Sequence, residues 1–170
     1  MAYDKSDLVM TYQFAAPVKR VWKAWTQEEE IKKWWGPEGF TVTHIEFDFR
    51  VEGKYFYCMH RVNTHGGKGW DFCSGGIFRD IVEPNPGRAG KIVMIDSFMD
   101  KKGNKVPAAH YGKSENFPLE TMIVATFKEE DGDTKLTLQY PDVGAINSKD
   151  LSNMKESWEQ SLRKLGEALK

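Results

Sequence analysis

The sequence predicts an α+β fold in which a curved antiparallel sheet wraps around a long C-terminal helix. Apolar residues recur at helical spacing over residues 147–170, whereas residues 40–140 alternate in the manner of strands. Most breaks between the strands are short turns, which join antiparallel neighbours rather than parallel ones. The expected order is one strand, two short helices, six strands and the final helix, in a single domain over residues 1–170 with its core at about 8–169.

The C-terminal segment is the longest helix that the sequence predicts. Its apolar residues lie three or four positions apart and therefore share one helix face: Leu151, Met154, Trp158, Leu162, Leu165 and Leu169. Asn147, followed three residues later by Asp150, suits the start of this helix. One face of the helix therefore needs a large apolar partner, which the strands upstream are expected to supply.

The N-terminal part contains a strand and two short helices. Residues 8–14 (LVMTYQF) form the expected strand, and Pro17 suits the first position of the helix that follows. Thr26 and Glu29 have the spacing of a capping box, with Thr26 as the N-cap of a second helix. This helix is expected to end at Gly36, because a glycine followed by proline terminates helices.

Six further strands are expected at residues 41–49, 54–61, 70–82, 91–99, 121–127 and 134–140. A long polar loop separates two of them at residues 100–119. Loops of this length inside a compact domain often act as lids over a functional site, and we expect this one, with the turn at residues 36–39, to cover a cavity.

The parity of the hairpins predicts which side chains face inward. A two-residue turn at Asp131 and Gly132 pairs Glu130 with Asp133. This pairing places six apolar residues on one face: Ile123, Ala125, Phe127, Leu136, Leu138 and Tyr140. The helix covers this face, and incomplete closure would leave a cavity between them. The residues expected to line it are Tyr55, Tyr57, Met59, Trp70, Phe72, Phe127, Leu136, Leu138, Met154 and Trp158.

The composition excludes several classes of protein. The 170 residues have a formal charge of −1 and no long basic run, which argues against nucleic-acid binding. No segment approaches the length of a membrane span, and the first ten residues lack the apolar stretch of a signal peptide. We therefore expect a soluble cytoplasmic protein that binds neither nucleic acid nor membrane.

Two cysteines lie on neighbouring strands of one expected hairpin. A register that pairs Cys58 with Cys73 also pairs His60 with Asp71, on the outer face of the sheet. Thiolate and imidazole are good zinc ligands, so these four residues are the candidate metal ligands, although lone Cys and His on strands are usually structural. Parity fixes which face each side chain is on, but the strand pairing could still shift by two residues. We expect neither a bound metal nor a disulfide in a reducing compartment.

The candidates for acid–base chemistry are Asp96, His110, Tyr111 and Glu120, on or near the long loop. Of these, His110 and Asp96 are the candidate catalytic residues, because histidine titrates near neutral pH and a carboxyl group can act as a base. No nucleophile–base spacing, metal motif or phosphate-binding loop accompanies them. We therefore expect neither catalysis nor a cofactor.

Several segments in a fixed order resemble one family. Residues 14–26 (FAAPVKRVWKAWT) are similar to the recurring start of the START/Bet v 1-like superfamily, called SRPBCC. Residues 34–37 (WWGP), 53–59 (GKYFYCM), 76–84 (GIFRDIVEP) and 134–138 (TKLTL) resemble its branch related to the activator of Hsp90 ATPase homologue 1, in its single-domain bacterial form. The likeness covers nearly the whole chain and implies the helix-grip fold.

The resemblance implies a small apolar molecule as the partner, bound without chemistry between the sheet and the last helix. One alternative is an enzyme of the cyclase or hydrolase type in the same cavity, and another is a protein-interaction module of the co-chaperone kind. Activation of Hsp90 is not expected, because the family's namesake needs a separate N-terminal domain for which 170 residues leave no room. We expect a monomer or homodimer, and no local motif identifies the ligand.

Overall fold

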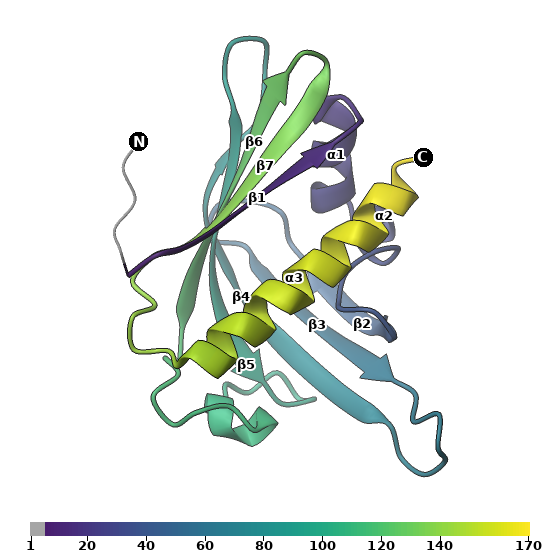
Figure 1. Cartoon of the computed structure of the whole chain (residues 1–170), viewed down its shortest axis with the longest axis vertical. Helices are drawn as coiled ribbons and strands as arrows, with labels where there is room; N and C mark the ends of the chain where they lie inside the picture. Colours follow the sequence, from purple (N-terminus) through teal and green to yellow (C-terminus); the bar gives the residue numbers. More distant parts are fainter. Residues whose placement is uncertain (1–5) are drawn as a thin grey trace.

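A computed structural model describes residues 6–170 and shows a strongly curved sheet that holds one long helix against its concave face (Figure 1). The seven antiparallel strands have the order β1-β7-β6-β5-β4-β3-β2, so β1 and β2 are the edges. This confirms the predicted fold class and order of elements. Residues 1–5, which belong to the predicted domain, lie outside the described residues. The elements are β1 (Leu8–Phe14), α1 (Val18–Thr26), α2 (Glu28–Ile31), β2 (Phe40–Phe47), β3 (Lys54–Arg61), β4 (Trp70–Val82), β5 (Gly90–Met99), η1 (Ala108–Tyr111), β6 (Thr121–Glu130), β7 (Asp133–Tyr140) and α3 (Ser148–Ala168).

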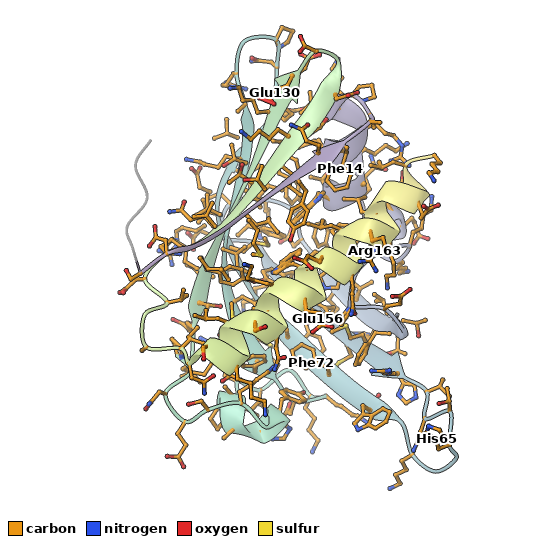
Figure 2. The ribbon with its side chains drawn as sticks, viewed as in Figure 1. Phe14, His65, Phe72, Glu130, Glu156 and Arg163 are labelled. Atoms are coloured by element: carbon orange, nitrogen blue, oxygen red, sulfur yellow. A yellow bond between two sulfur atoms is a disulfide. The ribbon has the colours of Figure 1, made fainter. Side chains whose placement is uncertain are left out.

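Helix α3 packs the predicted apolar face against the sheet. Leu162 and Leu165 are fully buried in its C-terminal half, and the other predicted apolar positions pack against the same core. Asn147 caps the helix as expected, because its Oδ1 accepts a hydrogen bond from the Asp150 amide at 2.8 Å. Glu156 and Arg163 lie on the opposite, exposed face (Figure 2). The helix is thus held by one face only.

The boundary between α1 and α2 differs from the prediction. Thr26 is the last residue of α1, and its hydroxyl donates to the Trp22 carbonyl one turn earlier at 2.9 Å. The N-cap of α2 is Gln27, which makes no capping bond through its side chain. The predicted capping box of Thr26 and Glu29 is therefore wrong, because the threonine hydroxyl is already used within the first helix.

The β6–β7 hairpin has the predicted register. Glu130 pairs with Asp133, and the two turn residues, Asp131 and Gly132, both have positive φ, as a two-residue turn of this type requires. Ala125 faces Leu138 and Phe127 faces Leu136, and all four side chains are fully buried. This pair of strands therefore contributes fully buried side chains to the concave face.

The β3–β4 hairpin settles the register that parity left open. Cys58 pairs with Cys73 and His60 with Asp71, and the two cysteines are joined by a disulfide with a Cα–Cα distance of 4.1 Å. The expectation that no disulfide forms is therefore wrong for this structure. Directly opposed strand residues bring their Cβ atoms close enough for the bond.

An irregularity in β4 contributes to the curvature of the sheet. The register with β5 shifts between Phe78 and Asp80, which marks a β-bulge. Close to the bulge, Gly76 lies so near β5 that a Cβ atom there would meet the Ile95 carbonyl oxygen at 1.7 Å. The missing side chain therefore allows the close backbone approach that the curvature requires.

We expect Gly76→Ala to lower the free energy of unfolding by at least about 2 kcal/mol, because a backbone carbonyl must move to admit the methyl group. Gly166→Ala provides the matched control. Gly166 lies within α3 with open space around its Cα, so there alanine should stabilise by about 0.5–1 kcal/mol through helix propensity. Urea denaturation measures both values. Equal effects at the two positions would contradict the role given to Gly76.

Reduction of the disulfide should lower the free energy of unfolding by about 2–3 kcal/mol, because the bond closes a loop with a sequence separation of 15 residues. The measurement is urea denaturation with and without a phosphine reductant. The double variant Cys58→Ala, Cys73→Ala should show no dependence on the reductant. Identical curves for the oxidised and reduced wild-type protein would refute this contribution.

Candidate functional site

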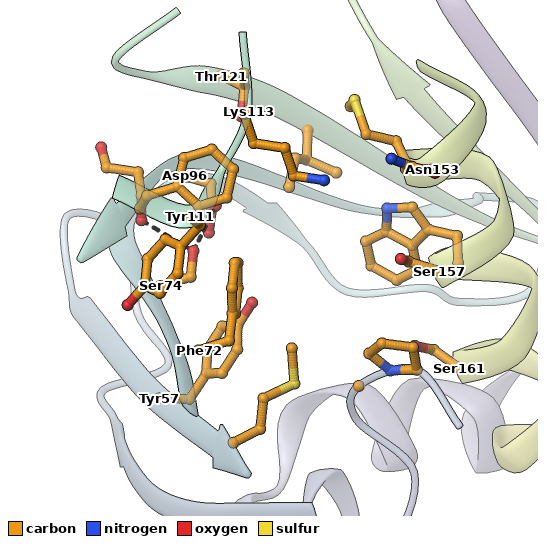
Figure 3. A pocket seen from close by; sticks show the side chains of 18 of the residues that line it. Tyr57, Phe72, Ser74, Asp96, Tyr111, Lys113, Thr121, Asn153, Ser157 and Ser161 are labelled. Atoms are coloured by element: carbon orange, nitrogen blue, oxygen red, sulfur yellow. Dashed lines mark hydrogen bonds between the residues drawn. The ribbon is translucent and has the colours of Figure 1, made fainter. Parts of the chain in front are cut away.

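A cavity of about 510 Å³ lies between the concave face of the sheet and the N-terminal half of α3. The loop that contains η1 closes one side, and the turn at Gly36 and Pro37 closes another. Aromatic side chains form a large part of the wall, and Figure 3 shows side chains from the strands and from α3 converging on the space. The aromatic residues that line it are Trp35, Phe40, Tyr55, Tyr57, Trp70, Phe72, Phe98, Tyr111, Phe117, Tyr140 and Trp158.

Trp158 divides the filled part of the interior from this hollow part. Its ring stacks on Trp25 of α1, with centroids 5.9 Å apart and planes within 9°. Its Nε1 donates to the Tyr140 hydroxyl at 2.7 Å, which ties α3 to β7. The other side of the ring faces the cavity. The long helix is therefore anchored where the packed core ends.

Seven of the ten residues predicted to line a cavity are found in its wall: Tyr55, Tyr57, Met59, Trp70, Phe72, Met154 and Trp158. Phe127, Leu136 and Leu138 are not, and this part of the prediction needs correction. They lie under α1, where Phe127 contacts Trp22 and Trp25 with ring centroids 5.1 and 5.4 Å apart. The sheet face is continuous, but α1 fills one half of it.

The structure adds wall residues that the sequence analysis did not single out. On β5, Met94 and Phe98 face inward on either side of Asp96, and strand alternation could have found them. On α3, polar residues at positions 153, 157 and 161 border the cavity (Figure 3). Their spacing of four was readable in the sequence, but they lie beside the apolar stripe that dominates the helix.

Asp96 is the acidic group of the inner wall. Its Oδ2 accepts a hydrogen bond from the Tyr55 hydroxyl at 2.5 Å, and its Oδ1 lies 2.7 Å from the Ser74 hydroxyl. The Ser74 oxygen is also 2.9 Å from the Ser97 carbonyl. A serine has one proton for these two acceptors. The Ser74 hydroxyl therefore donates to Asp96 or to the Ser97 carbonyl, or shares its proton between them.

Burial raises the pKa of Asp96 to about 6, although the hydrogen bonds from Tyr55 and Ser74 oppose this shift. Burial also raises the pKa of the Tyr55, Tyr57 and Tyr140 hydroxyls around it. These hydroxyls therefore stay neutral hydrogen-bonding groups at ordinary pH. The cavity thus holds one carboxyl group that changes charge near neutrality, surrounded by phenols that do not.

The loop between β5 and β6 forms part of the wall, as the sequence analysis expected of a lid. Tyr111 fixes it to the sheet, because its hydroxyl donates to the Met99 carbonyl at 2.5 Å and accepts from the Cys73 amide at 3.1 Å. Farther along, the Ser114 amide donates to Asp150 of α3 at 3.0 Å. Phe117 and Leu119 then reach the cavity. The loop is therefore bonded to the sheet and to α3.

The four acid–base candidates separate into two pairs. Asp96 and Tyr111 lie on the cavity, whereas His110 and Glu120 do not. His110 is exposed on η1 beside the Tyr111 ring, and Glu120 pairs with Lys105 at the surface. Of the two candidate catalytic residues, Asp96 therefore lies on the cavity and His110 does not.

The four candidate metal ligands are adjacent but already engaged. Cys58 and Cys73 share the disulfide, so neither offers a thiolate. His60 Nδ1 lies 2.8 Å from Asp71, which also pairs with Lys101 at 2.8 Å. Within residues 6–170, no group of three or more His, Cys, Asp and Glu side chains is arranged to hold a metal ion. The predicted register is correct, but it joins Cys58 to Cys73 by a disulfide and His60 to Asp71 by a side-chain contact of 2.8 Å.

Comparison with known proteins gives a consistent result. Residues 15–170 match the family model described as Activator of Hsp90 ATPase homolog 1-like protein. A solution structure of a protein from Arthrobacter aurescens is 22% identical, with a TM-score of 0.73 over 99% of this chain and 91% of that one. A crystal structure from Nitrosomonas europaea is 19% identical, with a TM-score of 0.71 over 98% and 96%. These likenesses show the fold, and no curated protein matches the sequence.

The Asp96 site predicts a pH-dependent effect of Asp96→Asn on stability. The folded-state pKa of about 6 exceeds the usual value, so the neutral form favours folding, and this contribution is lost as the pH rises through 6. Asparagine does not ionise, so the variant does not lose stability at this position as the pH rises. The stability of the variant relative to wild type should therefore increase by about 2 kcal/mol between about pH 4 and pH 7.5.

Urea denaturation at several pH values measures this difference. Asp71→Asn is the control, because Lys101 and His60 lower the pKa of Asp71 and its contribution is lost as the pH falls. The relative stability of that variant should not increase with pH. A pH-independent difference between Asp96→Asn and wild type would show that Asp96 is not held in a raised-pKa site.

Proposed function

This chain belongs to the Activator of Hsp90 ATPase homolog 1-like protein family, and we propose that it binds a small hydrophobic molecule between its sheet and α3 without catalysing a reaction. The observation that carries this proposal is the cavity of about 510 Å³ with its aromatic wall. Pockets for small molecules typically measure about 300–1,000 Å³ and combine apolar walls with a few polar groups. The ten predicted ligand-binding residues, corrected for the three that lie in the core, become the proposed contacts.

The energetics of the cavity support an occupant. Covering apolar wall surface that water otherwise contacts is favourable by about 25 cal/mol per Å². Water fills such a space poorly where the walls are aromatic, because it finds few polar partners there. A molecule that covers the rings of Tyr57, Phe72 and Trp158 would recover contacts that water does not supply. The fold is thus stabilised by a bound apolar molecule.

One observation favours an enzyme of the cyclase or hydrolase type as the second candidate. Asp96 has a pKa of about 6 inside an apolar cavity, which suits proton transfer at neutral pH. The cavity offers Asp96 no histidine partner, because His110 is outside it. Activity on a carbonyl substrate, abolished in Asp96→Asn, would favour this candidate.

The interaction-module alternative has less support. Two of the large exposed apolar residues among the described positions, Trp70 and Leu119, belong to the cavity wall; the others are Val51, Val62 and Met122. Protein-interaction surfaces typically expose one contiguous apolar patch of several hundred Å². The cavity therefore favours the binding proposal.

Other properties extend the proposal. No helix within residues 6–170 has the length and apolarity needed to cross a membrane. A single domain over residues 1–170, a cytoplasmic location and a monomeric or homodimeric state stay predictions, as does the absence of a cofactor. Hsp90 is not proposed as a partner.

Filling the cavity should abolish binding. Ser157→Trp places an indole in the space from α3, whereas Glu156→Trp places it on the exposed face of the same helix (Figures 2 and 3). We expect wild type and Glu156→Trp to take up the neutral apolar dye Nile red, and Ser157→Trp to lose at least about 90% of that uptake.

Native mass spectrometry of the purified protein, followed by denaturing extraction, would identify a co-purifying molecule. The proposal expects such a molecule to be lost from Ser157→Trp and kept by Glu156→Trp. Equal dye uptake by both variants would place the binding elsewhere. Absence of any dye uptake by the wild-type protein would overturn the cavity proposal.

A further inference from the structure

Asp96 occupies a position where the fold calls for an apolar residue. It lies on the concave face of β5, two residues from Met94 on one side and from Phe98 on the other, and all three line the cavity. Its strand neighbours are Gly76 and Thr121, so no large side chain covers it. Burying a carboxylate is costly unless it is paired. An acid at this position therefore needs a partner.

The described residues give Asp96 two hydrogen-bonding neighbours but no cation. The two hydrogen-bonding neighbours, Tyr55 and Ser74, are neutral hydroxyl groups. Within residues 6–170, Asp96 forms no ion pair with Lys, Arg or His. A carboxylate has about four lone-pair sites, and the bonds from Tyr55 and Ser74 use two of them. Asp96 therefore lacks a cationic partner.

The other charged groups on the wall are placed differently. Asp71 is engaged by Lys101 and His60, and the Arg61 guanidinium lies over the Trp70 ring at 5.8 Å. Lys113 comes from the loop after η1 and extends toward Asn153 of α3 (Figure 3). The groups on the elements around Asp96 are otherwise neutral: Tyr55, Tyr57, Ser74, Tyr111, Thr121, Tyr140, Asn153 and Ser157. Among the described wall residues, the negative charge that lacks a cationic partner therefore lies at Asp96.

We propose that the molecule bound in this cavity is an apolar amine, whose protonated nitrogen donates hydrogen bonds to the Asp96 carboxylate. This inference rests on the proposed function and adds the chemical class of the ligand. The ammonium group supplies the missing cationic partner, and the apolar body covers the aromatic wall. A charge-assisted bond of this kind is about twice as strong as a neutral one. An alcohol would make the weaker bond, and a carboxylate would be repelled.

The pairing makes binding depend on pH in a defined direction. Asp96 has a pKa of about 6 in the free protein, so about a tenth of it is ionised at pH 5 and nearly all at pH 7.5. An alkylamine keeps its proton throughout this range, as lysine does. The neighbouring tyrosines stay neutral because burial raises their pKa. Amine affinity should therefore rise about tenfold from pH 5 to 7.5, whereas alcohol affinity should not.

The experiment compares three ligands of equal length, decylamine, decanol and decanoate, by displacement of Nile red at about pH 5 and pH 7.5. We expect decylamine to bind at least about tenfold more tightly than decanoate at the higher pH, with decanol between them. Both this ranking and the rise of amine affinity with pH should vanish in Asp96→Asn, which keeps the shape of the side chain. Glu156→Gln, which removes one acid from the exposed face of α3, should behave as wild type.

Each other outcome overturns the inference in a recognisable way. Equal affinity for the three ligands would show cavity binding without recognition of charge. Tightest binding of decanoate, weakened in Lys113→Met, would assign recognition to Lys113 and an anionic ligand. Amine binding that weakens equally in Asp96→Asn and Glu156→Gln would reflect net charge alone. Failure of Nile red and all three ligands to bind would reject the proposed function together with this inference.

Discussion

The structure depends on how much of the concave sheet face its helices cover. Leu162 and Leu165 of α3 are fully buried, and Trp158 joins the helix to β7 through the Tyr140 hydroxyl. From Trp158 toward its N-terminus the helix lies over the cavity, which Asn153, Met154 and Ser157 border. The cavity follows from this arrangement. One anchored helix closes a face that is too broad for it to fill.

Curvature sets the shape of that space. The β-bulge near Phe78 and the close approach at Gly76 bend β4 around the interior, and Tyr55, Ser74 and Asp96 come from three adjacent strands at this bend. Bending brings their polar groups into hydrogen-bonding contact while the surrounding wall stays aromatic. The polar site and the curvature therefore share one structural origin. A flat sheet would hold the same residues without enclosing them.

Local patterns made most of the fold predictable. The helical spacing of α3, the two-residue turn at Asp131 and the alternation of each strand depend on neighbours in the chain, and all three appear in the structure. The N-cap of α2 was missed because Thr26 has two nearby backbone partners and uses the one in α1. The candidate site was predictable to the extent that it follows from strand parity. Parity placed Tyr55, Tyr57 and Phe72 on the inner face, but it also placed Phe127 there.

The sequence by itself determined the order of the elements, their types and the inward face of the strands in two hairpins, because these follow from periodicity and turn chemistry within a few residues. Only the tertiary structure decided which inward residues face a cavity and which are packed, since that depends on where α1 and α3 cross the sheet. It also decided the partners of Asp96 and the bond between Cys58 and Cys73. Those contacts depend on register and curvature, which are set by the packing of the whole sheet.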